Sequence, residues 1–177
     1  MEREHLFLNE RVHRNGGFLM SINHEQLTNF LVEAKISTYA SQGDDASVQP
    51  LLNGSKQLEY RSGDYFYRDI YFGSAFFIGQ ETVEFENRPI WSMVYSGGVI
   101  IPNADKDIIG SIYSFLRQAL RLVDTKSIYR GPNRFESSNY IFNNEYKGTL
   151  DCFYGNEIIL MGGQKVYELQ YNGGVVR

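Results

Sequence analysis

Two glutamates, Glu81 and Glu157, are the first candidates for chemistry, because strand alternation places each of them on an apolar face. The residues on the same faces are Phe77, Val83 and Phe85 for the first, and Phe153, Ile159 and Met161 for the second. A carboxylate in such a place must be paired or hydrogen-bonded, or its pKa must be raised, because desolvation disfavours its charged form. We favour a structural role for both, since the feature occurs twice, and keep general acid/base catalysis as the alternative.

Asp69 is the second candidate, because it is ionisable where a similar stretch later in the chain carries the neutral Asn144. Two similar stretches can divide labour at such a position. We nevertheless favour a solvent-facing aspartate flanked by tyrosines. Arg68 and Arg130 are candidates for binding an anionic ligand, although ion pairing with the carboxylates is the interpretation we favour.

Trp91 and Tyr95 share the parity of one strand, which predicts an aromatic stripe. Such stripes more often belong to a core, but aromatic side chains with a few inward polar groups also line ligand pockets. The residues predicted to bind a ligand are therefore Glu81, Glu157, Trp91, Tyr95, Asp69 and Arg68.

An internal repeat indicates the elements that must position these side chains. Three pairs of segments match in order along the chain: 64–73 with 139–148, 77–81 with 153–157, and 95–99 with 171–175. A shared register over this length predicts a duplicated supersecondary unit. The halves are residues 21–100 and 101–177, and residues 1–20 are expected to form a flexible arm.

Each half reads as a helix followed by about four antiparallel strands. Asn23 and Asp105 are suited to cap the two helices, whose apolar positions recur at helical spacing over 27–34 and 108–120. Residues 41–55 are predicted to form a long loop, and the Gly-Gly pairs at 97–98 and 173–174 to form turns. The fold class is α+β with pseudo-two-fold symmetry, either as two packed sheets or as one curved, barrel-like sheet with two helices.

The composition excludes several classes of protein. The 177 residues carry a formal net charge of −4, so we expect no direct nucleic-acid binding. No apolar run is long enough for a membrane span, and the N-terminus lacks a signal-peptide pattern. The single cysteine fits a reducing compartment, so we expect a cytoplasmic location. The three histidines all lie before or at the first helix, and we expect no metal and no cofactor.

A set of residues spread over both halves resembles an uncharacterised bacterial family, a domain of unknown function sometimes carried behind an XRE-type helix-turn-helix. The residues that carry the resemblance are Leu58-Glu59-Tyr60-Arg61, Gly63-Asp64-Tyr65, Asp69, Tyr71, Gly79, Glu81, Pro89, Trp91, Met93, Tyr95 and Tyr129-Arg130-Gly131-Pro132. The resemblance implies a cytoplasmic bacterial module that serves in some proteins as the non-DNA-binding half of a regulator. It implies no activity, and residues 1–20 are too few for a helix-turn-helix.

Three functions remain open from the sequence. The first is a small-molecule-binding or sensory module whose pocket lies between the halves. The second is an enzyme that uses a buried glutamate as a general acid/base on a small polar substrate. The third is a protein-interaction module, for example a homodimer, that uses an exposed strand edge or aromatic patch.

Overall fold

The computed structural model describes residues 22–38 and 48–177. The predicted arm, residues 1–20, lies outside the described residues. Residues 41–47 of the predicted 41–55 loop do so as well. The described chain forms two helices and eight strands, so the α+β class is confirmed. The elements are α1 (His24–Ser37), β1 (Lys56–Ser62), β2 (Tyr65–Gly73), β3 (Phe76–Phe85), β4 (Arg88–Val99), α2 (Lys106–Leu120), β5 (Arg134–Ser137), β6 (Tyr140–Thr149), β7 (Cys152–Met161) and β8 (Gln164–Val175).

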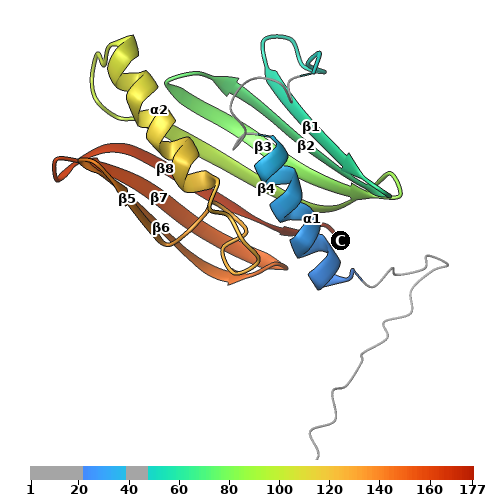
Figure 1. The fold of residues 1–177 in the computed structure, drawn as a ribbon. Helices are drawn as coiled ribbons and strands as arrows, with labels where there is room; N and C mark the ends of the chain where they lie inside the picture. The colour runs from blue at the N-terminus through green and yellow to red at the C-terminus, as the bar shows by residue number, and fades with distance from the viewer. Residues whose placement is uncertain (1–21, 39–47) are drawn as a thin grey trace, which may run out of the picture.

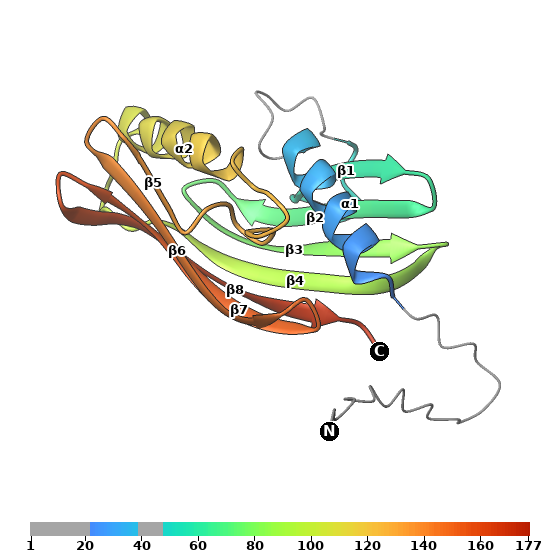
Figure 2. The same ribbon diagram turned by 60° about the horizontal axis from the view of Figure 1, so that its bottom comes forward.

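Both helices begin where the sequence predicts. The side chains of Asn23 and Asp105 accept hydrogen bonds from the backbone N–H groups of Gln26 and Ile108, at 3.1 and 2.8 Å. Each cap satisfies one backbone donor that the first helical turn leaves without a partner. The helices then lie on the same face of the sheet (Figure 1, Figure 2).

All eight strands belong to one antiparallel sheet in the order β1-β2-β3-β4-β8-β7-β6-β5. Two packed sheets are therefore wrong, and the single sheet is open, with β1 and β5 at its edges. Its centre is the pairing of β4 with β8, where Tyr95 lies opposite Tyr171. The internal duplication itself stays a prediction.

The predicted Gly-Gly turns are also wrong. Gly97 and Gly98 lie inside β4, and Gly173 and Gly174 lie inside β8. A Cβ atom on Gly97 would overlap the backbone of β8 at Leu169, and one on Gly173 would overlap the backbone of β4. These glycines allow the two central strands to approach each other closely.

The inner face of the sheet carries a continuous core that joins both helices to both ends of the sheet. Trp91 of β4 stacks on Phe153 of β7 with ring centroids 5.7 Å apart, and both side chains are buried. The burial alternates along β3 and β7 as predicted, so that Glu81 and Glu157 both lie on the inner face.

Candidate functional site

A cavity of about 410 Å³ lies between α2 and the inner face of β2, β3 and β4. Its walls are mainly aromatic and aliphatic, with polar groups at the buried inner end and at the exposed rim. The lining includes Asp69, Tyr95 and Arg130 at the inner end, and Tyr71, Phe77 and Tyr113 along the walls.

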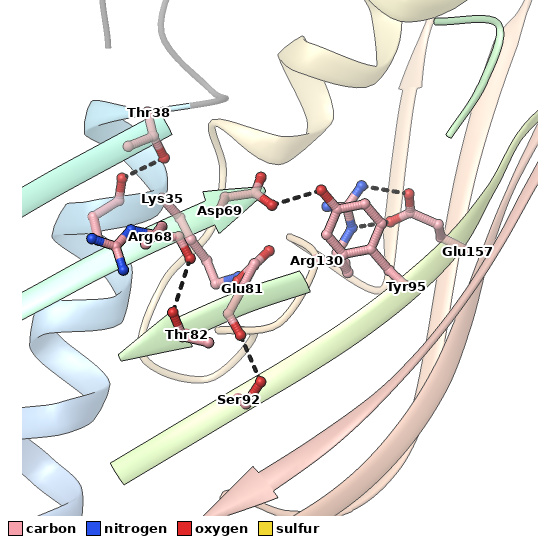
Figure 3. A network of polar contacts seen from close by, with 11 residues as sticks. Lys35, Thr38, Arg68, Asp69, Glu81, Thr82, Ser92, Tyr95, Arg130 and Glu157 are labelled. Atoms are coloured by element: carbon pink, nitrogen blue, oxygen red, sulfur yellow. Dashed lines mark hydrogen bonds and ion pairs between the residues drawn. The ribbon is translucent and has the colours of Figure 1, made fainter. Parts of the chain in front are cut away.

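The inner end of the cavity is built around the carboxyl group of Asp69. The Tyr95 hydroxyl donates a hydrogen bond of 2.7 Å to Asp69 Oδ1 (Figure 3). Gly79 lies between them in the sheet, and a Cβ atom there would overlap the Tyr95 ring. The glycine of β3 thus lets the phenol of β4 cross to the aspartate of β2. The other carboxyl oxygen, Oδ2, accepts no hydrogen bond from the described residues.

Burial raises the pKa of Asp69 to about 7, with the nearby Glu81 carboxylate as the second cause. The hydrogen bond from Tyr95 and the positive charges of Lys35 and Arg130 act in the opposite direction but do not cancel these effects. Asp69 can therefore accept or release a proton near neutral pH.

Glu81 is fully buried behind Asp69 and pairs with a cation from α1. Lys35 Nζ donates to Glu81 Oε2, and neither side chain is exposed to solvent. Desolvation lowers the pKa of Lys35, although the Glu81 carboxylate favours the charged amine. The other oxygen, Glu81 Oε1, has no hydrogen-bond partner among the described residues.

The Glu157 carboxylate accepts more hydrogen bonds than the Glu81 carboxylate. Arg130 donates to both of its oxygens, at 3.0 and 2.9 Å, and the Tyr167 hydroxyl donates to Oε1 at 2.8 Å. The Arg130 guanidinium also lies 5.7 Å from the centre of the Tyr95 ring, between that ring and Glu157 (Figure 3). This bidentate pair fixes the loop after α2 against the sheet.

The charges of this cluster do not balance when every group is ionised. Lys35 compensates Glu81, and Arg130 compensates Glu157, each through a direct ion pair. The cluster then has one further acid, Asp69, whose hydrogen bond from the described residues comes from the neutral phenol of Tyr95. Asp69 is the group of this cluster that a ligand or a proton must complement.

The structure brings only part of the predicted site together. Asp69 and Tyr95 line the cavity, Glu81 and Glu157 lie behind it in buried ion pairs, and Trp91 is a core residue. The interpretation of Asp69 as solvent-facing is wrong, because the side chain is 3% exposed. Arg68 lies on the opposite face of the sheet and pairs with Glu59 at 3.0 Å and Glu84 at 3.7 Å.

A model of one protein family, described as a domain of unknown function (DUF5680), matches residues 69–176. The chain belongs to this family. The match begins at Asp69 and includes Glu81, Arg130 and Glu157, whereas α1 with Lys35 precedes it. No curated protein matches the chain, and no solved structure matches it either. The bacterial origin and the association with a helix-turn-helix stay predictions.

Lys35 is the residue of this DUF5680 protein that the sequence interpretation missed. It ends the row Leu27, Leu31 and Lys35, which recurs every four residues along the apolar face of α1. A lysine at such a position must find a buried acid, so the row itself was a usable signal. The cavity residues of α2, such as Gly110 and Tyr113, were not predicted, because their role depends on where the helix lies on the sheet.

Two other hollows of the structure contain no unpaired buried acid among the described residues. The larger, about 1020 Å³, lies along β6, β7 and β8, where the Tyr171 hydroxyl donates to Asn144 Oδ1 at 2.7 Å. The other, about 500 Å³, lies on the outer face beside Arg68. The described residues contain no group of acidic, histidine or cysteine side chains that could hold a metal ion. They also contain no helix of the length and hydrophobicity that crossing a bilayer requires.

Proposed function

We propose that this protein binds a small molecule in the cavity between α2 and strands β2–β4. The observation that carries the proposal is the buried carboxyl group of Asp69 at the inner end of that cavity, with Oδ2 accepting no bond from the described residues. A buried acid without a charged partner is costly to the fold, and such groups are typical of binding and catalytic sites.

Gly110 of α2 supports the same proposal. It lines the cavity in the interior of a helix, and a Cβ atom at this position would have no neighbour within 4 Å. A glycine costs an exposed helix interior about 1 kcal/mol relative to alanine. No packing contact requires the glycine, so its effect is to leave room above the aromatic wall.

The test is a thermal-shift screen of a small-molecule library against the full chain and two variants that obstruct the cavity, Gly110→Phe and Ser74→Trp. Both positions are exposed and line the cavity from different elements, so both variants are expected to fold. Ser114→Phe adds the same bulk to α2 outside the lining and is the matched control.

We expect some compounds to raise the melting temperature of the wild type and of Ser114→Phe, because a ligand that binds only the native state stabilises it. The same compounds should shift neither obstructed variant. The proposal fails if no compound binds, or if the obstructed variants respond as the wild type does.

A second candidate function is catalysis with Asp69 as a general acid/base. The observation in its favour is that the pKa of Asp69, about 7, suits proton transfer near neutral pH. Glu81, the residue first considered for this role, does not line the cavity. If a reaction is found, turnover that is unchanged in Asp69→Asn would exclude this role.

We also propose that the two halves arose by duplication. Support comes from equivalent positions in the two halves. Tyr95 donates to Asp69, and Tyr171 donates to Asn144. The strand register also shifts at equivalent places, after Val83 in β3 and after Ile159 in β7. Under this proposal the equivalent positions diverged, so that the buried acid Asp69 lines a cavity in the first half and the neutral Asn144 lines one in the second.

A further inference from the structure

We propose that the ligand of this cavity carries a positively charged nitrogen on a flat, apolar body, and that its ammonium group binds Asp69 Oδ2. This inference rests on the proposed function and adds the chemical class of the ligand.

The charges at the inner end of the cavity favour a cationic ligand. Lys35 and Arg130 are each held by a carboxylate, Glu81 and Glu157, in ion pairs whose side chains are 5% exposed or less. An anionic ligand would therefore have to displace one of these buried carboxylates. A cation meets an acceptor that is already in place, the Asp69 oxygen Oδ2, which accepts no hydrogen bond from the described residues.

The wall of the cavity is formed by a group of aromatic rings. Phe77 lies at the centre of a group of rings, with centroids 6.3 Å from Tyr71, 5.9 Å from Tyr95 and 5.8 Å from Tyr113. All four rings line the cavity. Aromatic faces attract cations and also pack against a flat apolar body, so the wall favours both parts of the proposed ligand.

The hydrogen bonds made by the cavity's two phenols favour a ligand that carries a hydrogen-bond donor. The Tyr95 hydroxyl donates to Oδ1, and the Tyr113 hydroxyl donates to the Ala75 carbonyl at 2.7 Å. Both phenols therefore use their protons within the protein. The group of the ligand that reaches Asp69 must be a donor, and an ammonium supplies the charge as well as the hydrogen bond.

Other charged groups around Asp69 do not reverse this preference. The titratable groups that face it or line its cavity are Lys35 of α1, Lys56 of β1, Tyr71 of β2, Glu81 of β3, Tyr95 of β4, Tyr113 and Arg117 of α2, and Arg130 of the following loop. Lys56 and Arg117 are exposed at the rim, where water and salt screen their charges.

A cation should bind the ionised form of Asp69, so binding is coupled to proton release. Because the pKa of Asp69 in the free protein is about 7, its ionised fraction falls as the pH decreases below that value. We expect the affinity for an ammonium ligand to fall at least ten-fold between pH 8 and pH 5. A neutral ligand of the same shape should not show this dependence.

The experiment uses three probes of matched shape, 2-phenylethylamine, 2-phenylethanol and 3-phenylpropanoate, titrated into the full chain by ligand-observed NMR. At pH 8 we expect the amine to bind at least ten-fold more tightly than the alcohol or the acid. Asp69→Asn should remove this preference and leave the alcohol within two-fold of its wild-type affinity.

Asp69→Asn is expected to fold, because Asn144 accepts the same kind of hydrogen bond from Tyr171. Glu84→Gln, which removes a carboxylate on the outer face, is the matched control and should leave all three affinities unchanged.

The inference is overturned if the amine fails to bind, if the alcohol or the acid binds as tightly as the amine, or if Asp69→Asn keeps the preference. In those cases library compounds that still bind the wild type but not Gly110→Phe would leave the proposed function intact. Absence of binding by every probe and every library compound would overturn both.

Discussion

At each end of the sheet a buried tyrosine hydroxyl donates a hydrogen bond to a buried side chain, but the two acceptors differ. In β2–β4 the Tyr95 hydroxyl donates to an aspartate, and in β6–β8 the Tyr171 hydroxyl donates to an asparagine. The Asn144 side chain is satisfied on both sides, since its Nδ2 also donates to the Gly131 carbonyl at 3.2 Å. Asp69 instead keeps one oxygen toward a cavity.

The buried ion pairs behind Asp69 and Asn144 also differ in how many hydrogen bonds their carboxylates accept. Glu157 accepts bonds from Arg130 and Tyr167, whereas Glu81 accepts one from Lys35 and has an oxygen without a partner among the described residues. The β6–β8 end is thus complete as a scaffold. Among the described residues, the β2–β4 end is therefore where buried carboxyl oxygens lack a hydrogen-bond partner.

The largest effect is expected from the two buried glutamates. Glu157→Gln should cost about 3–5 kcal/mol of unfolding free energy, because it leaves a buried Arg130 that cannot lose its proton. Glu81→Gln should cost less, because burial already lowers the pKa of Lys35 and the amine can become neutral.

Urea denaturation of both variants between pH 7 and pH 9 checks this difference. In Glu81→Gln the unfolded chain binds more protons at Lys35 than the native protein, so the loss should shrink as the pH rises. Glu136→Gln, which removes an exposed pair with Arg134, is the control and should stay within about 0.5 kcal/mol of the wild type. Equal, pH-independent losses at Glu81 and Glu157 would contradict the comparison.

Asp69 and Asn144, which accept the tyrosine hydrogen bonds, can each be replaced by the other's residue type. Asp69→Asn should raise stability at pH 8 by up to about 4 kcal/mol, because the native pKa of about 7 lies above the ordinary value of 3.8 and each pKa unit corresponds to about 1.36 kcal/mol. A raised acid binds more protons in the native state, so wild-type stability falls as the pH rises from about 4 to 7. The gain should therefore disappear at pH 4.

Asn144→Asp is the reverse exchange. It should destabilise the protein at pH 8, because a buried carboxylate would replace an amide that donates to the Gly131 carbonyl, and the loss should be smaller at pH 4. Chemical denaturation at the two pH values measures both variants. A loss of stability at pH 8 in Asp69→Asn would show that the carboxylate is a structural requirement.

The smallest effect is expected from the two tyrosines. Tyr95→Phe removes a hydrogen bond to an ionised acid and should cost about 1.5–3 kcal/mol at pH 8, but less at pH 5, where Asp69 is protonated. Tyr171→Phe removes a bond to a neutral amide and should cost about 1 kcal/mol at both pH values. Thermal melts at the two pH values distinguish these patterns, and a pH-dependent loss in Tyr171→Phe would argue against the assignment.

The local parts of the fold were predictable from the sequence because they depend on short-range periodicity. The caps at Asn23 and Asp105 and the inward position of Glu81 follow from residues a few positions away. The shape of the sheet was not predictable, since it depends on the pairing of β4 with β8, whose residues are far apart in the chain. The close approach of those strands also explains why Gly97 was mistaken for a turn residue.

The candidate site was predictable only in part, for a similar reason. Alternation placed Asp69 on a tyrosine-rich face, but tyrosines occupy both buried and exposed faces, so the pattern could not decide its burial. The deciding contact comes from Tyr95, two strands away in the sheet. Lys35 was not among the predicted residues, although its place after Leu31 on the apolar row indicated a buried charge.

The pairing of β4 with β8 also has a consequence for how the chain reaches its native state. Every other strand pair joins neighbours along the chain, so those contacts close only short loops. The β4–β8 ladder alone closes the long segment between Val99 and Gln164, and the entropy of loop closure grows with length. Among the strand pairs, the largest entropy cost of loop closure therefore falls on the pairing of β4 with β8. The hairpins of β1–β4 and of β5–β8 can form before it, and the common core forms with it.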